Sequence, residues 1–485
     1  MTSPAVSPAD ARAAGVPALI QGGMGVGVSS WRLAAAVARS GGLGVVSGVG
    51  PDLLLARMLQ DGDPGGHVRG VLADYPDQEL VSSVLAKFFR PDGLADGEPY
   101  RPLPRLDLHQ RLEAVRFAAL GGYVQVALAK AGHDGQIGIN LLEKVQIWTA
   151  PVLVGALVAG VDVVLVGAGV PADLPRLLDG LSAGRTVRLP IDVEGAVDGD
   201  VFEMVVDPAE VLRAEAVTFR RPAFLAIVSS HVLANYLLRD EATAADGFVV
   251  EGWTAGGHNA PPRRAALDET GQTLYTDRDE ADLAKMAALG RPFWLAGGYG
   301  TPEKYVEALE AGAKGVQVGT PFALCHESGM RPDLRERVLD DLRAGTLTVR
   351  TDPLASPTGF PFKVLQLEGT LSDADVRTGR ERICDLGYLR TLVRRDDGTV
   401  GYRCPSEPVD AYVRKGGDAA DTEGRVCLCN GLLATAGFPQ RRGDGVEELP
   451  VLTLGADLAA VEELLADHPE GWGAGDVVAW ITGRS

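Results

Sequence analysis

The stretch DGFVVEGWTAGGH, residues 246–258, does most to decide the fold of this chain. It opens with the apolar run Phe248-Val249-Val250, typical of a buried strand, and it ends in two glycines and His258. In barrels of parallel strands the carboxyl ends of the strands face the active site, so a titratable side chain there is a candidate acid or base. His258 is therefore a candidate catalytic residue, although a histidine at a strand end can also simply hydrogen-bond to backbone.

The same pattern recurs along the chain on either side of this stretch. Apolar runs that end near glycine alternate with helical patterns, which is typical of parallel α/β folds. The candidate strands cover residues 18–22, 43–48, 137–142, 161–167, 224–230, 247–252, 293–298 and 316–320. Because there are eight of them, the sequence favours a closed (β/α)8 TIM barrel over an open sheet.

The spacing of these runs predicts additions to the barrel. We expect a flexible leader over residues 1–16 and a barrel over residues 17–334. A large insertion between the second and third strands, about residues 50–134, could cap the barrel mouth or make an oligomer contact. Alternating residues and the turn-prone Asp198-Gly199-Asp200 predict a hairpin excursion at about residues 186–207. The barrel pattern then stops, so residues 335–485 are predicted to form a C-terminal accessory domain.

Composition narrows the class of protein. The chain has 485 residues, of which 46% are hydrophobic, and a net charge of −19. This charge argues against a nucleic-acid surface, which needs clustered Lys and Arg. No apolar stretch reaches the roughly twenty residues that span a bilayer, and the first residues lack a secretory core. We therefore expect a cytoplasmic protein with no membrane partner, and a homodimer as the default assembly.

Two glycine-bearing strand ends predict a phosphate site. Ala296-Gly297-Gly298 ends the seventh strand, before a helix start at Thr301-Pro302, and Gly319-Thr320 ends the eighth. In many barrels the loops after these two strands together hold a phosphate. Tight turns without a ligand are the alternative, but the pair of motifs favours a cofactor that carries phosphate.

Other glycines follow the first strand, in the segment QGGMGVG at residues 21–27. They would let the backbone lie close to a flat ring system, with Met24 as a polarisable contact, or they could form a flexible turn. Asn140 is a polar side chain on an otherwise buried strand and must find partners there. Either a structural hydrogen bond or a contact to a cofactor would satisfy it.

Taken together, six segments resemble the nitronate monooxygenase family, formerly the 2-nitropropane dioxygenases. The relatives of this family include the flavin-containing enoyl-acyl carrier protein reductases. The resemblance covers roughly residues 17–330. The segments that carry it are IQGGMGVGVS (20–29), GGLGVVS (41–47), IGINL (137–141), DGFVVEGWTAGGH (246–258), LAGGYGTPE (295–303) and GVQVGTPF (315–322).

The resemblance implies a barrel that binds FMN, with His258 as the catalytic histidine. It implies that the cofactor is bound by Gln21, Gly22, Gly23, Met24, Asn140, Gly256, Gly257, Gly297, Gly298, Gly319 and Thr320. The activity first expected is oxidation of a nitronate or nitroalkane-like substrate by oxygen, with His258 as base. The alternative is NAD(P)H-dependent reduction of an enoyl thioester, in which His258 would act as the acid that protonates the α carbon. A third hypothesis is a flavin-binding accessory subunit with little turnover.

Several features exceed the simplest members of that family. His258 is followed by the stiff, basic loop 259–264, in which Arg263 or Arg264 could clamp a carboxylate or phosphate, or simply be solvated. Ser229, Ser230 and His231 follow the fifth strand and could contribute to a substrate pocket. The insertion and the C-terminal region suggest a larger substrate or a carrier-bound acyl chain.

Four of the five cysteines lie in the C-terminal region: Cys384, Cys404, Cys427 and Cys429. Four thiols can hold Zn²⁺ or an iron–sulfur cluster, but the usual pair of closely spaced knuckles is absent. Buried or reactive free thiols are therefore favoured. Cys325 lies outside this group and is predicted to be part of the core.

One competing motif is set aside. Residues 164–172, VLVGAGVPA, read as a strand followed by Gly-x-Gly-x-x-Ala, a dinucleotide-binding fingerprint, with Asp192 downstream. Pro171 stands where the helix should already be running, and Asp192 falls in the predicted hairpin. A Rossmann dehydrogenase would also leave the other six segments unexplained.

Overall fold

The structure is a computed structural model that describes residues 12–443 and 445–483. Its centre is a barrel of eight parallel strands, ordered β1-β10-β9-β8-β7-β4-β3-β2, and a bridge between Ile20 and Leu43 joins the two ends of this order. The (β/α)8 prediction is confirmed. The strands are β1 (Leu19–Gln21), β2 (Gly44–Ser47), β3 (Ile137–Leu142), β4 (Val163–Gly167), β7 (Ala223–Val228), β8 (Gly247–Glu251), β9 (Phe293–Ala296) and β10 (Gly315–Val318).

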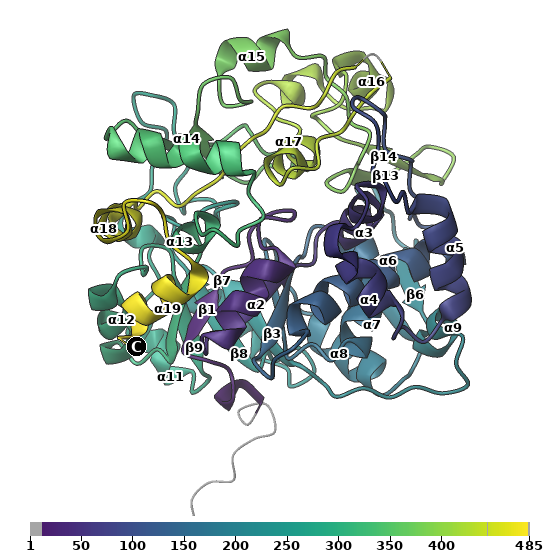
Figure 1. Ribbon diagram of the computed structural model, residues 1–485, viewed down its shortest axis with the longest axis horizontal. Coiled ribbons are helices and arrows are strands. Elements are labelled where there is room, and N and C mark those ends of the chain that lie inside the picture. Colours follow the sequence, from purple (N-terminus) through teal and green to yellow (C-terminus); the bar gives the residue numbers. More distant parts are fainter. Residues whose placement is uncertain (1–11, 444, 484–485) are drawn as a thin grey trace, which may run out of the picture.

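Alternation along the strands separates two hydrophobic layers. Val163 and Leu165 of β4 belong to the cluster that fills the barrel interior, whereas Val164 and Val166 pack into the larger cluster under the helices. Around the barrel lie α2 (Trp31–Arg39), α6 (Leu112–Lys130), α7 (Gln146–Val158), α8 (Leu174–Ser182), α10 (His231–Leu237), α11 (Leu283–Ala288), α12 (Pro302–Glu310) and the short α13 (Thr320–Ala323) (Figure 1).

The longest helix, α6, is long and apolar enough to cross a membrane, but 78% of its apolar window is buried inside the protein. It packs closely on α7, because an added Cβ at Gly155 would lie only 1.7 Å from the carbonyl oxygen of Ala119. α6 is therefore a core helix of the barrel layer. It begins at Leu112, inside the predicted insertion, and ends at Lys130.

The predicted insertion consists of helices followed by an irregular stretch. α3 (Pro51–Gln60), the 3-10 turn η1 (Pro64–Gly66), α4 (His67–Leu72) and α5 (Gln78–Phe88) lie beside α6, at the right of Figure 1. The chain then runs without helix or strand through residues 89–111. The predicted hairpin is present as β5 (Val187–Pro190) and β6 (Glu203–Val206), which pair antiparallel and lead into α9 (Pro208–Leu212).

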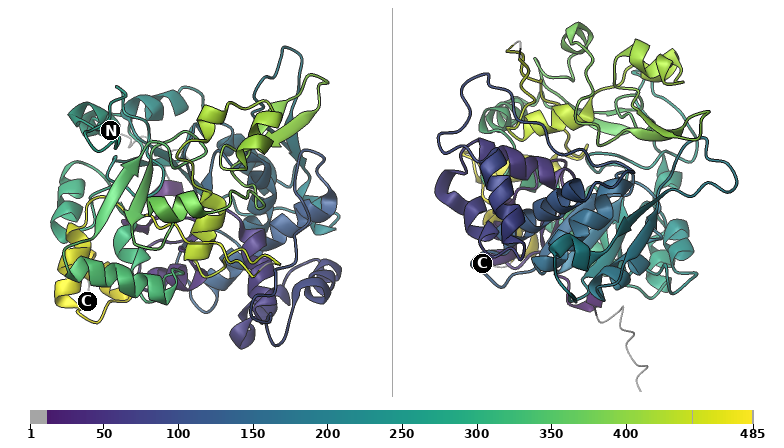
Figure 2. Two further views of the ribbon diagram at one scale, coloured as in Figure 1. Left: turned by 90° about the horizontal axis from the view of Figure 1, so that it is seen from above. Right: turned by 90° about the vertical axis from the view of Figure 1, so that its right-hand side faces the viewer.

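The C-terminal region covers the barrel end and then returns to its side (Figures 1 and 2). α18 and α19 pack against α12, α13 and α2 of the barrel. Whether residues 335–485 form a domain of their own stays a prediction. One 3-10 turn, η2 (Asp277–Asp279), lies in the loop between β8 and α11. The elements of the C-terminal region are α14 (Pro332–Arg343), β11 (Thr348–Asp352), β12 (Phe362–Gln366), α15 (Ala374–Gly379), β13 (Thr391–Arg394), β14 (Val400–Arg403), α16 (Val409–Arg414), η3 (Ala419–Thr422), α17 (Leu428–Thr435), α18 (Ala459–Asp467) and α19 (Ala474–Thr482).

Candidate active site at the barrel mouth

Two adjoining chambers lie at the carboxyl ends of the barrel strands. Each has a volume of about 150 Å³, and they share Gly23, Glu251 and Gln317 in their walls. We call the one that contains Asn140 and His258 the inner chamber, and the one that contains Gly297, Gly298 and Gly319 the phosphate chamber. Active sites of TIM barrels lie at this end of the barrel.

His258 lies in the wall of the inner chamber, and the C-terminal region fixes its ring. Its Nε2 is 2.7 Å from the Oγ of Ser356, and its ring stands edge-on to Phe362 with centroids 4.9 Å apart. A backbone bridge also pairs His258 with Phe362 at the start of β12. Burial lowers the pKa of His258 to about 4, so the imidazole is neutral at neutral pH. A neutral ring whose Nε2 is engaged presents Nδ1 as the remaining nitrogen.

Glu251 is the second titratable group and forms part of both chambers. It ends β8, seven residues before His258. Burial raises the pKa of its carboxyl group to about 8, so the group is protonated at neutral pH. The chambers therefore hold a neutral base and a neutral acid, a pairing suited to proton transfer.

The inner chamber has the features expected where a flat heterocycle binds. The side-chain oxygens of Asn140 and Gln317 are buried and lack a hydrogen-bond partner in the structure, and both residues line this chamber. Gly23 lies so close to Asn140 that an added Cβ would be 2.2 Å from the Cβ of that residue. Unpaired buried amides beside a cavity favour a ligand with hydrogen-bonding edges.

The phosphate chamber contains the predicted strand-end glycines. Gly297 and Gly298 have φ of 81° and 77°, a left-handed conformation that glycine adopts readily. Thr320 begins α13, and its Oγ1 accepts a hydrogen bond of 2.9 Å from the backbone N–H of Gly455. Asp457 also lines this chamber, so one carboxylate lies beside the predicted phosphate site.

Most of the predicted cofactor residues meet here. Gln21 does not, because its side chain is fully buried and its Oε1 accepts from the backbone N–H of Val45, while its Nε2 donates to Gly22 and Ser29. Gln21 therefore holds the glycine loop, residues 22–27, in place. The residues that line one or both chambers are Gly22, Gly23, Met24, Asn140, Gly256, Gly257, Gly297, Gly298, Gly319 and Thr320.

The predicted substrate residues lie elsewhere. Ser229, Ser230 and His231 line neither chamber, and Ser230 instead caps α10 by accepting from the backbone N–H of Leu233. Arg263 is exposed, and its backbone N–H donates to Asp279. Ser229 and Ser230 directly follow the end of β7, yet neither they nor Arg263 line the chambers.

All five cysteines are free thiols. Within residues 12–443 and 445–483, no group of three or more His, Cys, Asp and Glu side chains is placed to hold a metal ion. The thiol of Cys384 is hydrogen bonded to that of Cys404, which lowers the pKa of Cys384 to about 7. Cys427 is buried, Cys429 lines the inner chamber, and Cys325 is buried in the core as predicted.

Sequence reasoning missed the residues that the C-terminal region brings to the cavity. Ser356 and Phe362 hold His258, and Leu432, Thr453 and Leu454 close the chambers. These residues lie in irregular segments or short elements without a motif, so no local pattern marked them. Glu251 and Gln317 lay within the quoted motifs, and their polarity in otherwise apolar strands was the available signal.

Comparison with known proteins relates part of this chain to the nitronate monooxygenases. A family profile described as nitronate monooxygenase matches residues 209–353. A nitronate monooxygenase of Pseudomonas aeruginosa is 35% identical over 125 residues, which are 26% of this chain and 34% of that protein. A (3aS,4S,5R,7aS)-5-hydroxy-7a-methyl-1-oxo-octahydro-1H-indene-4-carboxyl-CoA dehydrogenase of Mycobacterium tuberculosis is 26% identical over 219 residues, 42% of this chain and 57% of that protein.

The matched segments thus span less than two thirds of the length of these curated relatives. A solved structure of a nitroalkane oxidase from Streptomyces ansochromogenes has 17% sequence identity and covers 97% of this chain and 95% of its own, with a TM-score of 0.46. The profile match includes the strand that carries Glu251 and the histidine that follows it. The resemblance predicted from the sequence motifs is therefore confirmed, and residues 209–353 are the part of the chain that matches the nitronate monooxygenase profile.

Proposed function

We propose that this chain is an FMN-dependent oxidoreductase that oxidises a nitronate or nitroalkane-like substrate with oxygen. The observation that carries the proposal is the neutral His258 in the wall of a chamber that continues into a glycine-lined phosphate chamber. The family match supports oxidoreductase chemistry. This combination supports a base that acts beside a phosphate-bearing ring cofactor.

The residues present fit FMN. The unpaired amides of Asn140 and Gln317 would meet the polar edge of the ring, while Gly297, Gly298, Gly319 and Thr320 would surround the phosphate. When bound, FMN supplies the electron transfer between substrate and oxygen that no side chain of this chain can perform.

The side chains of the protein would bind the substrate, orient it and remove its proton. Ser356 fixes the His258 ring through Nε2, so Nδ1 is the atom that would accept a carbon-bound proton or donate a hydrogen bond to an anionic nitronate. Leu142, Ile227 and Phe362 line the same chamber and reduce its water content. Proton transfer generally contributes about 10²- to 10⁴-fold to a rate.

A second candidate is NAD(P)H-dependent reduction of an enoyl thioester. It is favoured by a larger cleft of about 620 Å³ that shares Leu53, Tyr388 and Leu389 with the inner chamber, which is more room than a small nitronate needs. In this reaction the protonated Glu251 would be the group able to give a proton to the α carbon. A curated relative named as a carboxyl-CoA dehydrogenase also supports a carrier-linked substrate.

Two parallel assays distinguish these activities. Oxygen consumption is measured with the nitronate of 2-nitropropane, and NADPH oxidation is measured with crotonyl-CoA, both on FMN-loaded protein. Nitronate-dependent oxygen consumption that is indifferent to NADPH supports the first proposal, and NADPH oxidation that requires crotonyl-CoA supports the second. Bound FMN with neither activity would favour an accessory subunit.

The remaining predictions concern setting and partners. The net charge of −19 supports a small-molecule or carrier-bound substrate rather than nucleic acid. We propose a cytoplasmic location, no membrane partner and a homodimer, and light scattering of the purified protein would test the assembly.

A further inference from the structure

The larger cleft, which we call the outer cleft, lies between three segments that are far apart in the sequence. They are the irregular residues 100–106 of the insertion, the start of α7, and residues 385–392 of the C-terminal region. Its volume of about 620 Å³ is in the range of cavities that hold drug-sized ligands. Leu53, Tyr388 and Leu389 line both this cleft and the inner chamber, so a ligand could occupy both.

Among the residues that line the outer cleft, cations outnumber carboxylates, although the whole chain has 46 Lys and Arg against 65 Asp and Glu. Its cations are Arg57, Arg101, Arg105, Lys144 and Arg390, and its carboxylates are Asp52, Asp192 and Asp385. A local charge opposite to that of the whole molecule favours an anionic ligand.

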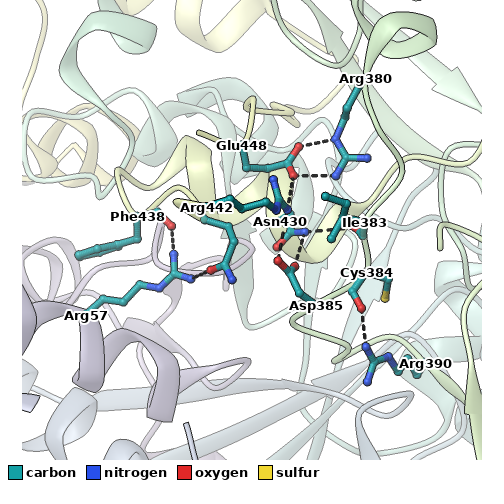
Figure 3. A network of polar contacts seen from close by, with 11 residues as sticks. Arg57, Arg380, Ile383, Cys384, Asp385, Arg390, Asn430, Phe438, Arg442 and Glu448 are labelled. Atoms are coloured by element: carbon teal, nitrogen blue, oxygen red, sulfur yellow. Dashed lines mark hydrogen bonds and ion pairs between the residues drawn. The ribbon is translucent and has the colours of Figure 1, made fainter. Parts of the chain in front are cut away.

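Each carboxylate already has a partner. Asp52 accepts hydrogen bonds from the Tyr388 hydroxyl at 2.8 Å and from the Trp148 ring at 3.2 Å, and burial raises its pKa. Asp192 accepts from Gln146 at 3.0 Å. Figure 3 shows Asp385 beside Asn430, whose amide donates to it at 2.8 Å, and Arg442 lies 3.3 Å from its other oxygen.

Four of the cations retain donors that could bind a ligand. Arg101 donates to the carbonyl of Lys87, Arg105 is 3.8 Å from Asp107, and Lys144 is 3.9 Å from Glu143. Arg390 donates to the carbonyl of Cys384 (Figure 3), and its buried Nε has no partner in the structure. Arg57 differs, since it is held by Phe438 and Gln440.

A helix end adds to this charge independently. Gln146, Ile147 and Trp148, the first residues of α7, line the outer cleft. No side chain caps this helix, and its first turn has no acidic residue. The free N–H groups and the partial positive charge at the start of a 13-residue helix therefore face a cleft already lined by cations.

We propose that the outer cleft binds the phosphate-bearing tail of a ligand whose reactive end lies in the inner chamber. The shared chemistry is an adenosine diphosphate with a further phosphate on its ribose, which coenzyme A thioesters and NADPH have in common. This inference rests on the second candidate function, the reduction of an enoyl thioester, because it places the reactive end of the ligand beside His258.

The test is calorimetric titration of FMN-loaded protein with coenzyme A and, separately, with NADP⁺, at low and high salt. The variants are the double charge reversal Arg101→Glu/Arg105→Glu and the milder Lys144→Gln. Arg414→Glu, an exposed position on α16 outside the cleft, is the matched control. Because charge-assisted hydrogen bonds contribute about 1.5–3 kcal/mol each, we expect the double variant to weaken binding by roughly tenfold or more. Salt should also weaken binding by the wild type.

The outcomes separate the two sources of the tail. Binding of coenzyme A alone identifies a thioester, binding of NADP⁺ alone identifies the hydride donor, and binding of both supports the shared chemistry. Failure of both ligands to bind, or equal affinity in the double variant, Lys144→Gln and wild type, overturns the inference. These titrations are scored whether or not nitronate is consumed, and failure to bind FMN counts against the proposed function alone.

Discussion

At the residue scale, burial sets the protonation of the two acid–base groups at the mouth. Burial lowers the pKa of His258 to about 4 and raises that of Glu251 to about 8. His258 loses its neutral form as pH falls through about 4, and Glu251 becomes a carboxylate as pH rises through about 8. Between these values both groups are uncharged, and this is the pH window in which we expect turnover to be highest.

Glu251→Gln should remove the alkaline limb of this profile. Above pH about 8 the wild-type carboxylate adds a negative charge beside an anionic nitronate, so kcat/KM should fall, whereas the glutamine variant should stay level. The control is Glu303→Gln, at an exposed position on α12, which should keep the wild-type profile. An equal alkaline fall in wild type and Glu251→Gln would exclude Glu251 as its cause.

Two glutamines show how far the role of a single residue can be predicted from the sequence. Gln21 and Gln317 are both polar residues in short apolar strands, yet the first is satisfied within the glycine loop and the second leaves an unpaired oxygen at the inner chamber. The sequence predicted a cofactor contact for Gln21 and none for Gln317. Which polar side chain of a strand finds protein partners depends on neighbouring loops, which the local pattern does not determine.

At the element scale, the β11–β12 hairpin supports the histidine loop through a buried lysine. The Lys363 side chain is fully buried, bonds to Thr351 and lies 5.5 Å from the Trp253 ring centroid. Burial lowers its pKa to about 8, from the usual 10.5 of a lysine in water. Since the unfolded chain holds this proton more tightly, stability should rise with pH between about 8 and 10.5.

Lys363→Met should therefore abolish that part of the pH dependence. The measurement is Tm against pH for both proteins, with Lys304→Met on the exposed face of α12 as control. We expect the Tm difference between wild type and Lys363→Met to change across this window, because only the wild type has the buried amine. Parallel curves would show that the Lys363 amine does not titrate differently on folding.

Residues 453–457 of the C-terminal region lie against the phosphate chamber. Asp457 lines this chamber, and its Oδ2 would be 3.2 Å from a Cβ added at Gly298. A carboxylate this close should oppose a bound phosphate, so Asp457→Asn should tighten FMN binding several-fold, by about 1 kcal/mol. Flavin fluorescence titration measures the affinity, and unchanged or weaker binding would place the phosphate elsewhere. Asp467→Asn, at the end of α18, is the control.

The strands were predictable because each is a short apolar run that ends near glycine, and the hairpin because its residues alternate. The strand-end glycines likewise line a cavity at the barrel mouth, and that they bind phosphate stays a prediction. Residues 450–457 were not predictable as cavity wall, because they form no helix or strand and reach the mouth only through contacts distant in sequence. Such contacts leave no periodic trace in the sequence.

At the scale of the whole molecule, the last part of the C-terminal region, with α18 and α19, packs against the side of the barrel. Trp472 is 1% exposed, and its ring N–H donates to the carbonyl of Pro321 at 2.9 Å, next to Thr320 in the phosphate chamber. Trp472→Ala should lower the free energy of unfolding by about 3–5 kcal/mol. It should also release FMN, since the segment with Thr320 and Pro321 loses the side chain that packs behind it. Trp480→Ala, at a half-buried position on α19, should cost less. Equal Tm and FMN content in wild type and Trp472→Ala would show that this last part of the chain does not stabilise the barrel.

The central claim is that FMN binds at the barrel mouth and that His258 acts on the substrate there. The most direct test is anaerobic stopped-flow mixing of the yellow, FMN-loaded protein with a nitronate, for wild type and His258→Asn, followed by admission of oxygen. We predict that the wild-type flavin spectrum changes and recovers with oxygen, and that His258→Asn retains FMN but reacts at least about a hundredfold more slowly. Equal rates would remove His258 from the mechanism, and a colourless protein that takes up no added FMN would contradict the account as a whole.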